Sequence, residues 1–271
     1  MLMRALGLLA TCGALLVAGC GGGDGGSKKK PATTAASETA PDRGDFKLTS
    51  QPPSADNKDA AALLDATEVV KGLVDGMNSA VALPHNVAVR IQNADEGPYY
   101  DPSTRTLVVG YPFVNLVAQT FNDADPKITD EDLASKTSNV IAFVLLHEMG
   151  HALVDQLELP ITGREEDSVD NLATVMTAGV LEEGGIALDS AEFFSYLQQD
   201  PRTLKASDFW DEHSLDAQRA NTMACLVFGS DEKQFAALAE YIPEDRRVRC
   251  ADEWKQAFDS WDQLLTPYIK D

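Results

Sequence analysis

The sequence predicts an α+β domain that is mostly helical, with a small antiparallel β-sheet ahead of a long buried helix. Two short runs that alternate between apolar and polar residues, at 87–91 and 106–111, predict strands. A strongly apolar run of helical length follows at 138–157, and helical spacing of apolar residues continues almost to the end of the chain.

The elements before the long helix are predicted from changes in this spacing. A first helix at 60–78 carries apolar residues such as Leu63 and Val74 three and four positions apart. Turn residues at 101–104 then separate the two predicted strands, which indicates a small hairpin or part of a small sheet. A short helix is expected at 113–121.

The long helix is expected to end before Pro160 and Gly163, which are typical of a helix end. The chain then turns back, so a following helix can lie antiparallel to it. Further helices are predicted at 164–180, 190–199, 214–228, 232–241 and 251–265.

Three segments differ in composition. Residues 1–19 join Arg4 to an apolar stretch too short to span a bilayer, which predicts an export signal. Residues 20–56 are rich in Gly, Pro, Ala, Thr and Ser, with Phe46 as an isolated aromatic, and predict a flexible tether. Residues 57–271 are long enough for one domain with its own core.

The export signal ends in LVAGC at 16–20, which resembles the lipobox of bacterial lipoproteins. The resemblance implies cleavage before Cys20 and diacylation of its thiol, which attaches a protein stably to a membrane. An ordinary secretory signal, in which Cys20 has no role, is the alternative. We therefore expect an exported protein anchored to a bacterial membrane, in the cell envelope.

Charge and cysteine usage agree with export. The chain has 43 acidic and 22 basic residues and a formal net charge of −21, so we expect no nucleic-acid partner, which would need basic patches. With Cys12 in the signal and Cys20 lipidated, Cys225 and Cys250 remain as one pair, which an oxidising compartment favours as a disulfide. Zinc binding by this pair is disfavoured because no other Cys or His lies two to four positions from either.

Residues 147–151 spell HExxH within the apolar helix. Four residues turn an α-helix through roughly 400°, so His147 and His151 project from one face and can both bind one zinc ion. Glu148 lies about 100° round the helix, where it can act on a metal-bound water without being a ligand. Two of the four histidines in the chain are used here.

A catalytic zinc site needs a third protein ligand. The metzincin pattern fails because residue 157 is leucine, not histidine. Asp155 shares the histidine face, but its Cα lies about 12 Å along the helix axis from that of His147, too far for a short carboxylate. The next acidic cluster includes Glu165, Glu166 and Asp170; an acidic helix N-terminus with no metal role is the other interpretation.

HExxH followed by a second helix with Glu166 and Asp170 four positions apart is similar to gluzincins. The resemblance implies that Glu166 is the third zinc ligand and that Asp170 hydrogen-bonds the far nitrogen of His147. Glu165, one position earlier, is the alternative ligand. The fold implied is a zincin-like domain.

The chain also resembles a family of bacterial metallopeptidases defined mostly from sequence. The matching segments span about residues 60–268, nearly the whole expected domain. They include 100–102, 106–109, HEMGH at 147–151, PITGREED at 160–167, 211–215, 249–250 and 261–267. The resemblance implies a peptidase and says little about its substrate.

These observations predict a membrane-anchored zinc peptidase that hydrolyses a peptide or protein, with Glu148 as general base. His213 is a candidate to stabilise the tetrahedral oxyanion, with a structural capping role as the alternative. By analogy with related proteases, the strand at 106–111 is expected to bind substrate by edge pairing.

Two other functions stay open. One is a non-enzymatic zinc-binding lipoprotein or partner-binding pseudo-peptidase. Glu148 argues against it, since a structural site needs no base and usually closes with four ligands. The other is hydrolysis of a different amide, such as a cell-wall peptide.

Overall fold

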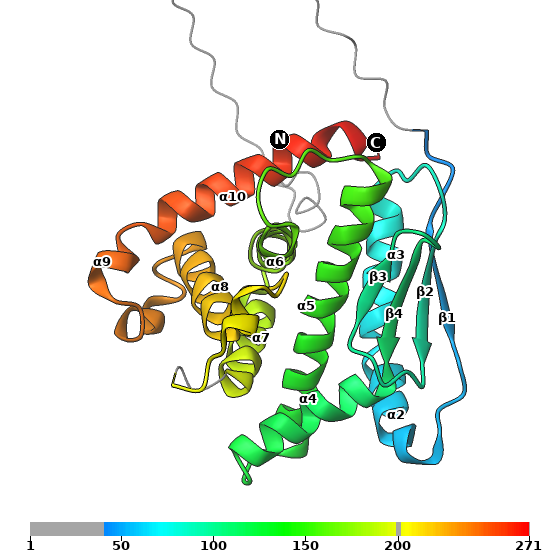
Figure 1. The fold of residues 1–271 in the computed structure, drawn as a ribbon, viewed down its shortest axis with the longest axis horizontal. Coiled ribbons are helices and arrows are strands. Elements are labelled where there is room, and N and C mark those ends of the chain that lie inside the picture. Colours follow the sequence, from blue (N-terminus) through cyan, green and yellow to red (C-terminus); the bar gives the residue numbers. More distant parts are fainter. Residues whose placement is uncertain (1–40, 199–201, 271) are drawn as a thin grey trace, which may run out of the picture.

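The β-sheet stands at one side of the molecule, against the long helix (Figure 1). In this computed structural model, which describes residues 41–198 and 202–270, four strands pair in the order β1-β2-β4-β3. They are β1 (Phe46–Ser50), β2 (Val87–Gln92), β3 (Tyr99–Asp101) and β4 (Thr106–Gly110). The predicted signal peptide, Cys20 and the first part of the predicted tether lie outside the described residues.

The α+β class is confirmed, but the sheet is mixed, not antiparallel. β1 and β4 both run parallel to β2, and only β3 pairs antiparallel with β4. The turn predicted at 101–104 therefore joins β3 to β4, and β2 reaches its parallel partner through the short edge strand β3. Alternation of residue types marks a strand but carries no direction, so the sequence could not distinguish these pairings.

The domain begins earlier than predicted. The prediction that a tether extends to residue 56 is wrong, because β1 pairs with β2 along its whole length and Phe46 is buried in the core. A five-residue edge strand has little periodicity of its own, and it is held by pairing with residues some 40 positions later.

The first helices pack around the sheet and the long helix. The segment predicted as one helix at 60–78 forms α2 (Lys58–Thr67) and α3 (Val69–Ala80), which meet at Glu68 with φ of 50°. The short helix predicted after the strands is α4 (Tyr111–Ala124). A short 3-10 helix, η1 (Ala55–Asn57), precedes α2.

Helix α5 (Asp130–Gln156) is the axis of the fold and carries the HExxH motif. It begins where the Thr129 side chain accepts a hydrogen bond from the backbone N–H of Asp132, with three acidic residues in its first turn. Its middle is buried nearly all round because α3 and the sheet pack on one side and α4, α6 and α7 on the others. Apolar residues on every face explain why the sequence alone indicated a buried helix.

The C-terminal half is helical. It consists of α6 (Glu165–Val175), which continues into the π-helix η2 (Met176–Val180), then α7 (Gly184–Leu197), η3 (Ala206–Phe209), α8 (Asp216–Ser230), η4 (Ala236–Glu240), α9 (Glu244–Arg247), α10 (Cys250–Leu265) and η5 (Thr266–Tyr268). Within the two described ranges, no helix combines the length and apolarity needed to cross a membrane.

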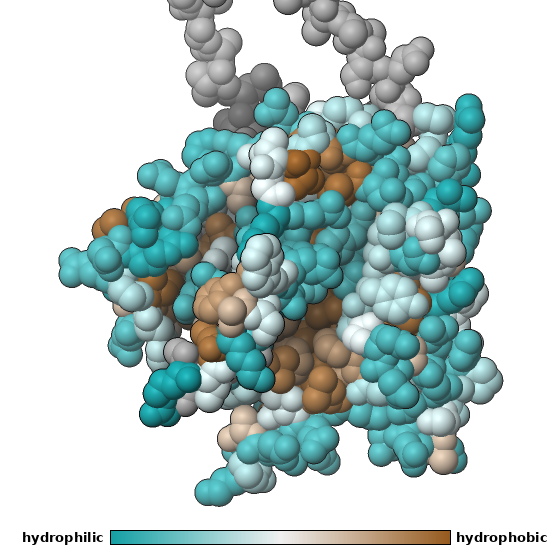
Figure 2. All heavy atoms as spheres, in the orientation of Figure 1, coloured by the Kyte–Doolittle hydropathy of each residue, from teal (hydrophilic) through white to brown (hydrophobic). Residues whose placement is uncertain are grey.

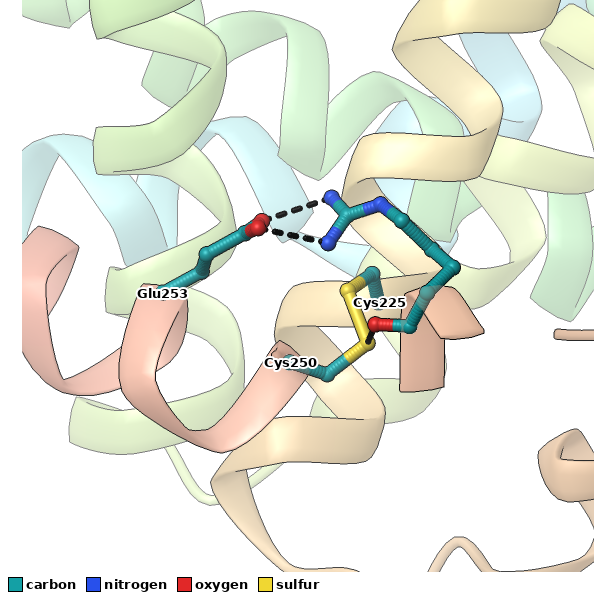
Figure 3. The surroundings of a disulfide bond; sticks show 4 residues. Cys225, Cys250 and Glu253 are labelled. Carbon is teal, nitrogen blue, oxygen red and sulfur yellow. Dashed lines mark hydrogen bonds and ion pairs between the residues drawn. A yellow bond between two sulfur atoms is a disulfide. The ribbon is translucent and has the colours of Figure 1, made fainter. Parts of the chain in front are cut away.

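A disulfide between Cys225 and Cys250 joins α8 to the start of α10, as predicted (Figure 3). Both cysteines are fully buried in a small second core with Phe228 and Ile242. Beside it, the guanidinium of Arg246 donates two hydrogen bonds of 2.6 Å to the carboxylate of Glu253. The bridge therefore fixes the outer helices α8–α10 to one another.

Candidate metal centre

Helices α5 and α6 meet at Gly150, inside the HExxH motif. A Cβ at this position would lie 2.9 Å from the Cβ of Val169 on α6, so only glycine permits this approach. The prediction that the two helices run antiparallel is wrong: Figure 1 shows α6 nearly end-on beside α5, so they cross. The connection through residues 157–164 is long enough to redirect the chain, and the crossing places the first turn of α6 over the two histidines.

Three side chains converge at this crossing. The Nε2 atoms of His147 and His151 lie 3.3 Å apart. Glu166 reaches both, with Oε2 3.2 Å from Nε2 of His147 and Oε1 3.3 Å from Nε2 of His151. The structure therefore brings together the two predicted histidines and Glu166.

Carboxylates on the far side of both rings fix which nitrogen faces this centre. Nδ1 of His147 lies 2.8 Å from Oδ1 of Asp170, and Nδ1 of His151 lies 2.8 Å from Oε1 of Glu165. A carboxylate accepts a hydrogen bond from an Nδ1–H, which leaves Nε2 of a neutral ring as a bare acceptor. Glu165 therefore lies behind the ring of His151, whereas the Glu166 carboxylate lies beside the Nε2 atoms of both rings.

When both rings are neutral, the centre is consequently a cluster of acceptors with no donor between them. Glu166 Oε2 is buried and accepts no hydrogen bond of normal geometry, although two imidazole nitrogens lie near it. Acceptors that face one another at 3.2–3.3 Å require a proton or a cation among them. This orphaned oxygen and its nitrogen and oxygen donor set fit a divalent metal ion.

Without a metal ion, protons take its place. Burial alone would lower the pKa of His147, but Asp170, Glu166 and Glu148 outweigh it and raise that pKa to about 9. Burial would raise the pKa of Glu166, yet its three histidine neighbours hold it far below the ordinary value. The cluster therefore favours a bound positive charge.

Asp170 is itself held by Arg219. The guanidinium of Arg219 donates to both carboxylate oxygens, from Nε at 2.7 Å and from Nη2 at 2.9 Å, and stacks 4.0 Å over the ring of Phe194. Burial raises the pKa of Asp170, but Arg219 and His147 overcome this and lower it to about 2. Asp170 thus stays ionised, and α8 and α7 support the position of His147.

Glu148 points into the same region from the buried face of α5. Its side chain is buried and lines the cleft beside both histidines. Burial raises the pKa of Glu148, and the nearby imidazoles oppose this shift only in part. A carboxyl group with a raised pKa beside these converging imidazole nitrogens is suited to proton transfer.

His213 joins the cluster from the loop that precedes α8. Its Nε2 lies 3.0 Å from Oε2 of Glu166, and His147, Glu166 and His213 offer ligand atoms within 4.8 Å of one another. The loop is tied to α6, because Ser214 donates to Asp167 at 2.6 Å and Arg164 donates to the carbonyl of His213 at 3.3 Å. His213, the predicted candidate for oxyanion stabilisation, therefore lies at the same centre as the HExxH histidines.

These groups line an open cleft of about 660 Å³ between β3 and the loop carrying His213. On the β3 side the hydroxyl of Tyr100 donates a 2.7 Å hydrogen bond to Asp155, which lines the same cleft. Figure 2 shows this face as mainly hydrophilic, with hydrophobic side chains gathered in the hollow over α5. A larger groove of about 800 Å³ beside α10 contains none of the histidines.

Two further contacts of the centre depend on the packing of separate elements. One is the support of His151 by Glu165, which the sequence offered only as an alternative ligand. The other is the link between Tyr100 and Asp155, which joins the edge strand to the last turns of α5. Both depend on how separate elements are placed, and no local pattern reports that.

A family model described as "Putative metallopeptidase" matches residues 50–265. The match covers most of the chain, so the chain belongs to this family. No curated protein and no solved structure matches it.

Proposed function

We propose that this member of the metallopeptidase family is a zinc-dependent peptidase. The observation that carries the proposal is the triangle of His147 Nε2, His151 Nε2 and the Glu166 carboxylate, with edges of 3.2–3.3 Å. Ligand atoms about 2.0 Å from a tetrahedral zinc ion are about 3.3 Å apart. Two imidazoles and one carboxylate with a base alongside are the donor set of a catalytic zinc site.

A zinc ion held by these residues would supply a Lewis acid that polarises a peptide carbonyl and lowers the pKa of a water molecule. Glu148 takes a proton from the attacking water and passes it to the leaving amine. Asp170 and Glu165 keep Nδ1 of each histidine protonated and so keep both Nε2 atoms directed at the centre. His213 donates a hydrogen bond to the oxyanion that develops on the substrate.

The substrate in this proposal is an extended peptide bound at the free edge of β3. The expectation that the strand at 106–111 offers this edge is wrong, because β4 is covered by β2 on one side and β3 on the other. β3 is the outer strand of the sheet, and Tyr99 and Tyr100 line the cleft that holds the histidines. An exposed strand edge can hydrogen-bond the main chain of an extended peptide.

Location outside the cytoplasm is part of the same proposal. The lipobox-like sequence ending at Cys20 and the disulfide of the folded domain both support export. Lipidation at Cys20 would hold the peptidase at a membrane of the cell envelope.

The test is hydrolysis of a mixed peptide library by the zinc-loaded full-length chain, followed by mass spectrometry. We expect Glu148→Gln to retain about one zinc per chain and to lose cleavage by at least ~100-fold, the scale of general-base catalysis. His151→Ala should lose both cleavage and bound zinc. Glu131→Gln, an exposed residue in the first turn of the same helix, is the matched control and should behave as wild type.

Two results would contradict the proposal. If the wild-type protein takes up no zinc, these residues do not form a zinc site. Zinc uptake with no cleavage of any library peptide favours the non-enzymatic zinc-binding lipoprotein or another amide as substrate.

A further inference from the structure

His213 shares a pattern with the two HExxH histidines. Each of the three rings presents Nδ1 to a carboxylate, which is Asp170 for His147, Glu165 for His151 and Asp211 for His213. Each also directs Nε2 at the carboxylate of Glu166. A carboxylate behind Nδ1 is the usual support of a metal-binding histidine, whereas a histidine that only caps a helix has no need of it.

The position of His213 is also that of a ligand. Its Nε2 lies 3.0 Å from the orphaned Oε2 of Glu166, closer than the Nε2 of His147 at 3.2 Å. Its ring stacks nearly parallel to that of His147, with an interplanar angle of 17°. Ligand atoms of His147, Glu166 and His213 lie within 4.8 Å of one another, a group that does not include His151, so the imidazole joins the donor set by moving toward His151.

The three histidines differ in how firmly they are held. The supporting carboxylates become more exposed in the order Asp170, Glu165, Asp211, with 8%, 45% and 61% of each side chain accessible. The contact of His213 with Asp211 is also the longest of the three, at 3.3 Å. Because exposed ion pairs contribute little, His213 is the histidine most easily displaced.

Little buried apolar surface holds the ring of His213 in place, although the backbone of its loop is tied to α6. Phe209 and Trp210, four and three residues earlier, are 61% and 89% exposed. The His213 side chain itself is 41% exposed. Rotation of the ring toward solvent therefore uncovers little buried apolar surface.

We propose that His213 is a fourth, displaceable metal ligand, which closes the centre at rest and gives up its place when substrate arrives. The displaced ring remains beside the cleft, where it donates to the oxyanion. The inference rests on the proposed function and adds a closed resting state, in which zinc is held by three imidazoles and Glu166. Structural zinc sites usually have four protein ligands, whereas catalytic sites have three and leave one position open. A displaceable fourth ligand explains why four candidate ligands and the base Glu148 occur together here.

The test is X-ray absorption at the zinc edge, which counts imidazole ligands. We expect three imidazoles in the zinc-loaded full-length wild type, and two after acetohydroxamate, a bidentate oxygen ligand, is added. His213→Ala should show two imidazoles in both conditions and bind acetohydroxamate about tenfold more tightly. Asp211→Asn, which leaves the ring in place, should also tighten acetohydroxamate binding.

His85 is the matched control, because it is the one histidine of the four that lies outside the cluster, in an exposed loop. His85→Ala should keep three imidazoles. Two imidazoles in untreated wild type would overturn the inference and leave the peptidase proposal intact. Three imidazoles that persist under saturating acetohydroxamate would show that His213 is a fixed ligand, and this result would also overturn the inference. A protein that binds no zinc would contradict the peptidase proposal itself.

Discussion

His147 and His151 face each other through their Nε2 atoms at 3.3 Å, while carboxylates hold both Nδ1 atoms. Two bare nitrogens in this arrangement repel unless a cation or a proton lies between them. The same relationship that builds a metal site therefore makes metal and protons compete for it.

Zinc affinity should rise with pH. The pKa of His147 is raised to about 9 in the metal-free protein, so this ring is protonated at neutral pH and must lose its proton when zinc binds. Below pH 9 the apparent affinity should increase about tenfold per pH unit for this one proton, and flatten above it. Competition with a chromophoric chelator from pH 6.5 to 9.5 measures this slope.

A flat profile over this range would show that the ring is already neutral in the metal-free protein. The pKa of Asp170 is lowered to about 2, so its ionisation does not change over this range and cannot produce the slope. Calorimetry in two buffers of different ionisation enthalpy gives an independent count of the protons released.

Asp170→Asn should weaken zinc binding by about 10–100-fold and leave the fold intact. The amide keeps the size of the side chain but loses the charge that holds the Nδ1 proton of His147 and pairs with Arg219. Glu165→Gln is the comparison, and its effect should be smaller because Glu165 is 45% exposed. Equal losses for the two variants would contradict the unequal support of the two histidines.

Arg219 should act on the metal through Asp170. Arg219→Lys keeps the charge but loses the two-pronged contact with Asp170 and the stacking on Phe194, so zinc affinity should fall about tenfold. In an Asp170→Asn background the same change should have much less effect, because the residue that transmits it is gone. Additive losses in the double variant would point to a purely structural role.

Gly150→Ala should separate α5 from α6. The new methyl group would lie 2.9 Å from the Cβ of Val169, an atom that cannot rotate away, so α6 must shift. We expect a loss of about 1–3 kcal/mol in the free energy of unfolding. Zinc binding should also weaken, because Glu166 lies on α6. Gly163→Ala, where nothing lies within 4 Å of an added Cβ, is the control.

Removing the disulfide should destabilise the protein without altering the metal centre. The bridge closes a loop with a sequence separation of 25, for which chain entropy predicts about 3.5 kcal/mol. Urea unfolding of the Cys225→Ala/Cys250→Ala variant, with zinc titration alongside, measures both effects. An unchanged unfolding midpoint after reduction of the wild type would show that the bridge adds no stability.

The sequence predicts the local parts of this structure better than their arrangement. HExxH on a buried helix and the acidic start of α6 follow from spacing alone, because four residues make about one helical turn. The parallel pairing of β1 with β2, the crossing of α6 over Gly150 and the approach of His213 to Glu166 join distant residues. The geometry of these contacts is set by packing between distant elements. Phe46 is an example, because its burial in the core places residues of the predicted tether inside the folded domain.

The metal centre is tested most directly by the anomalous scattering of zinc-loaded crystals of the full-length protein, recorded on both sides of the zinc edge. We expect one strong peak per chain, bounded by His147 Nε2, His151 Nε2 and the carboxylate of Glu166. A strong peak elsewhere, or none at this centre at full zinc occupancy in solution, would contradict this expectation.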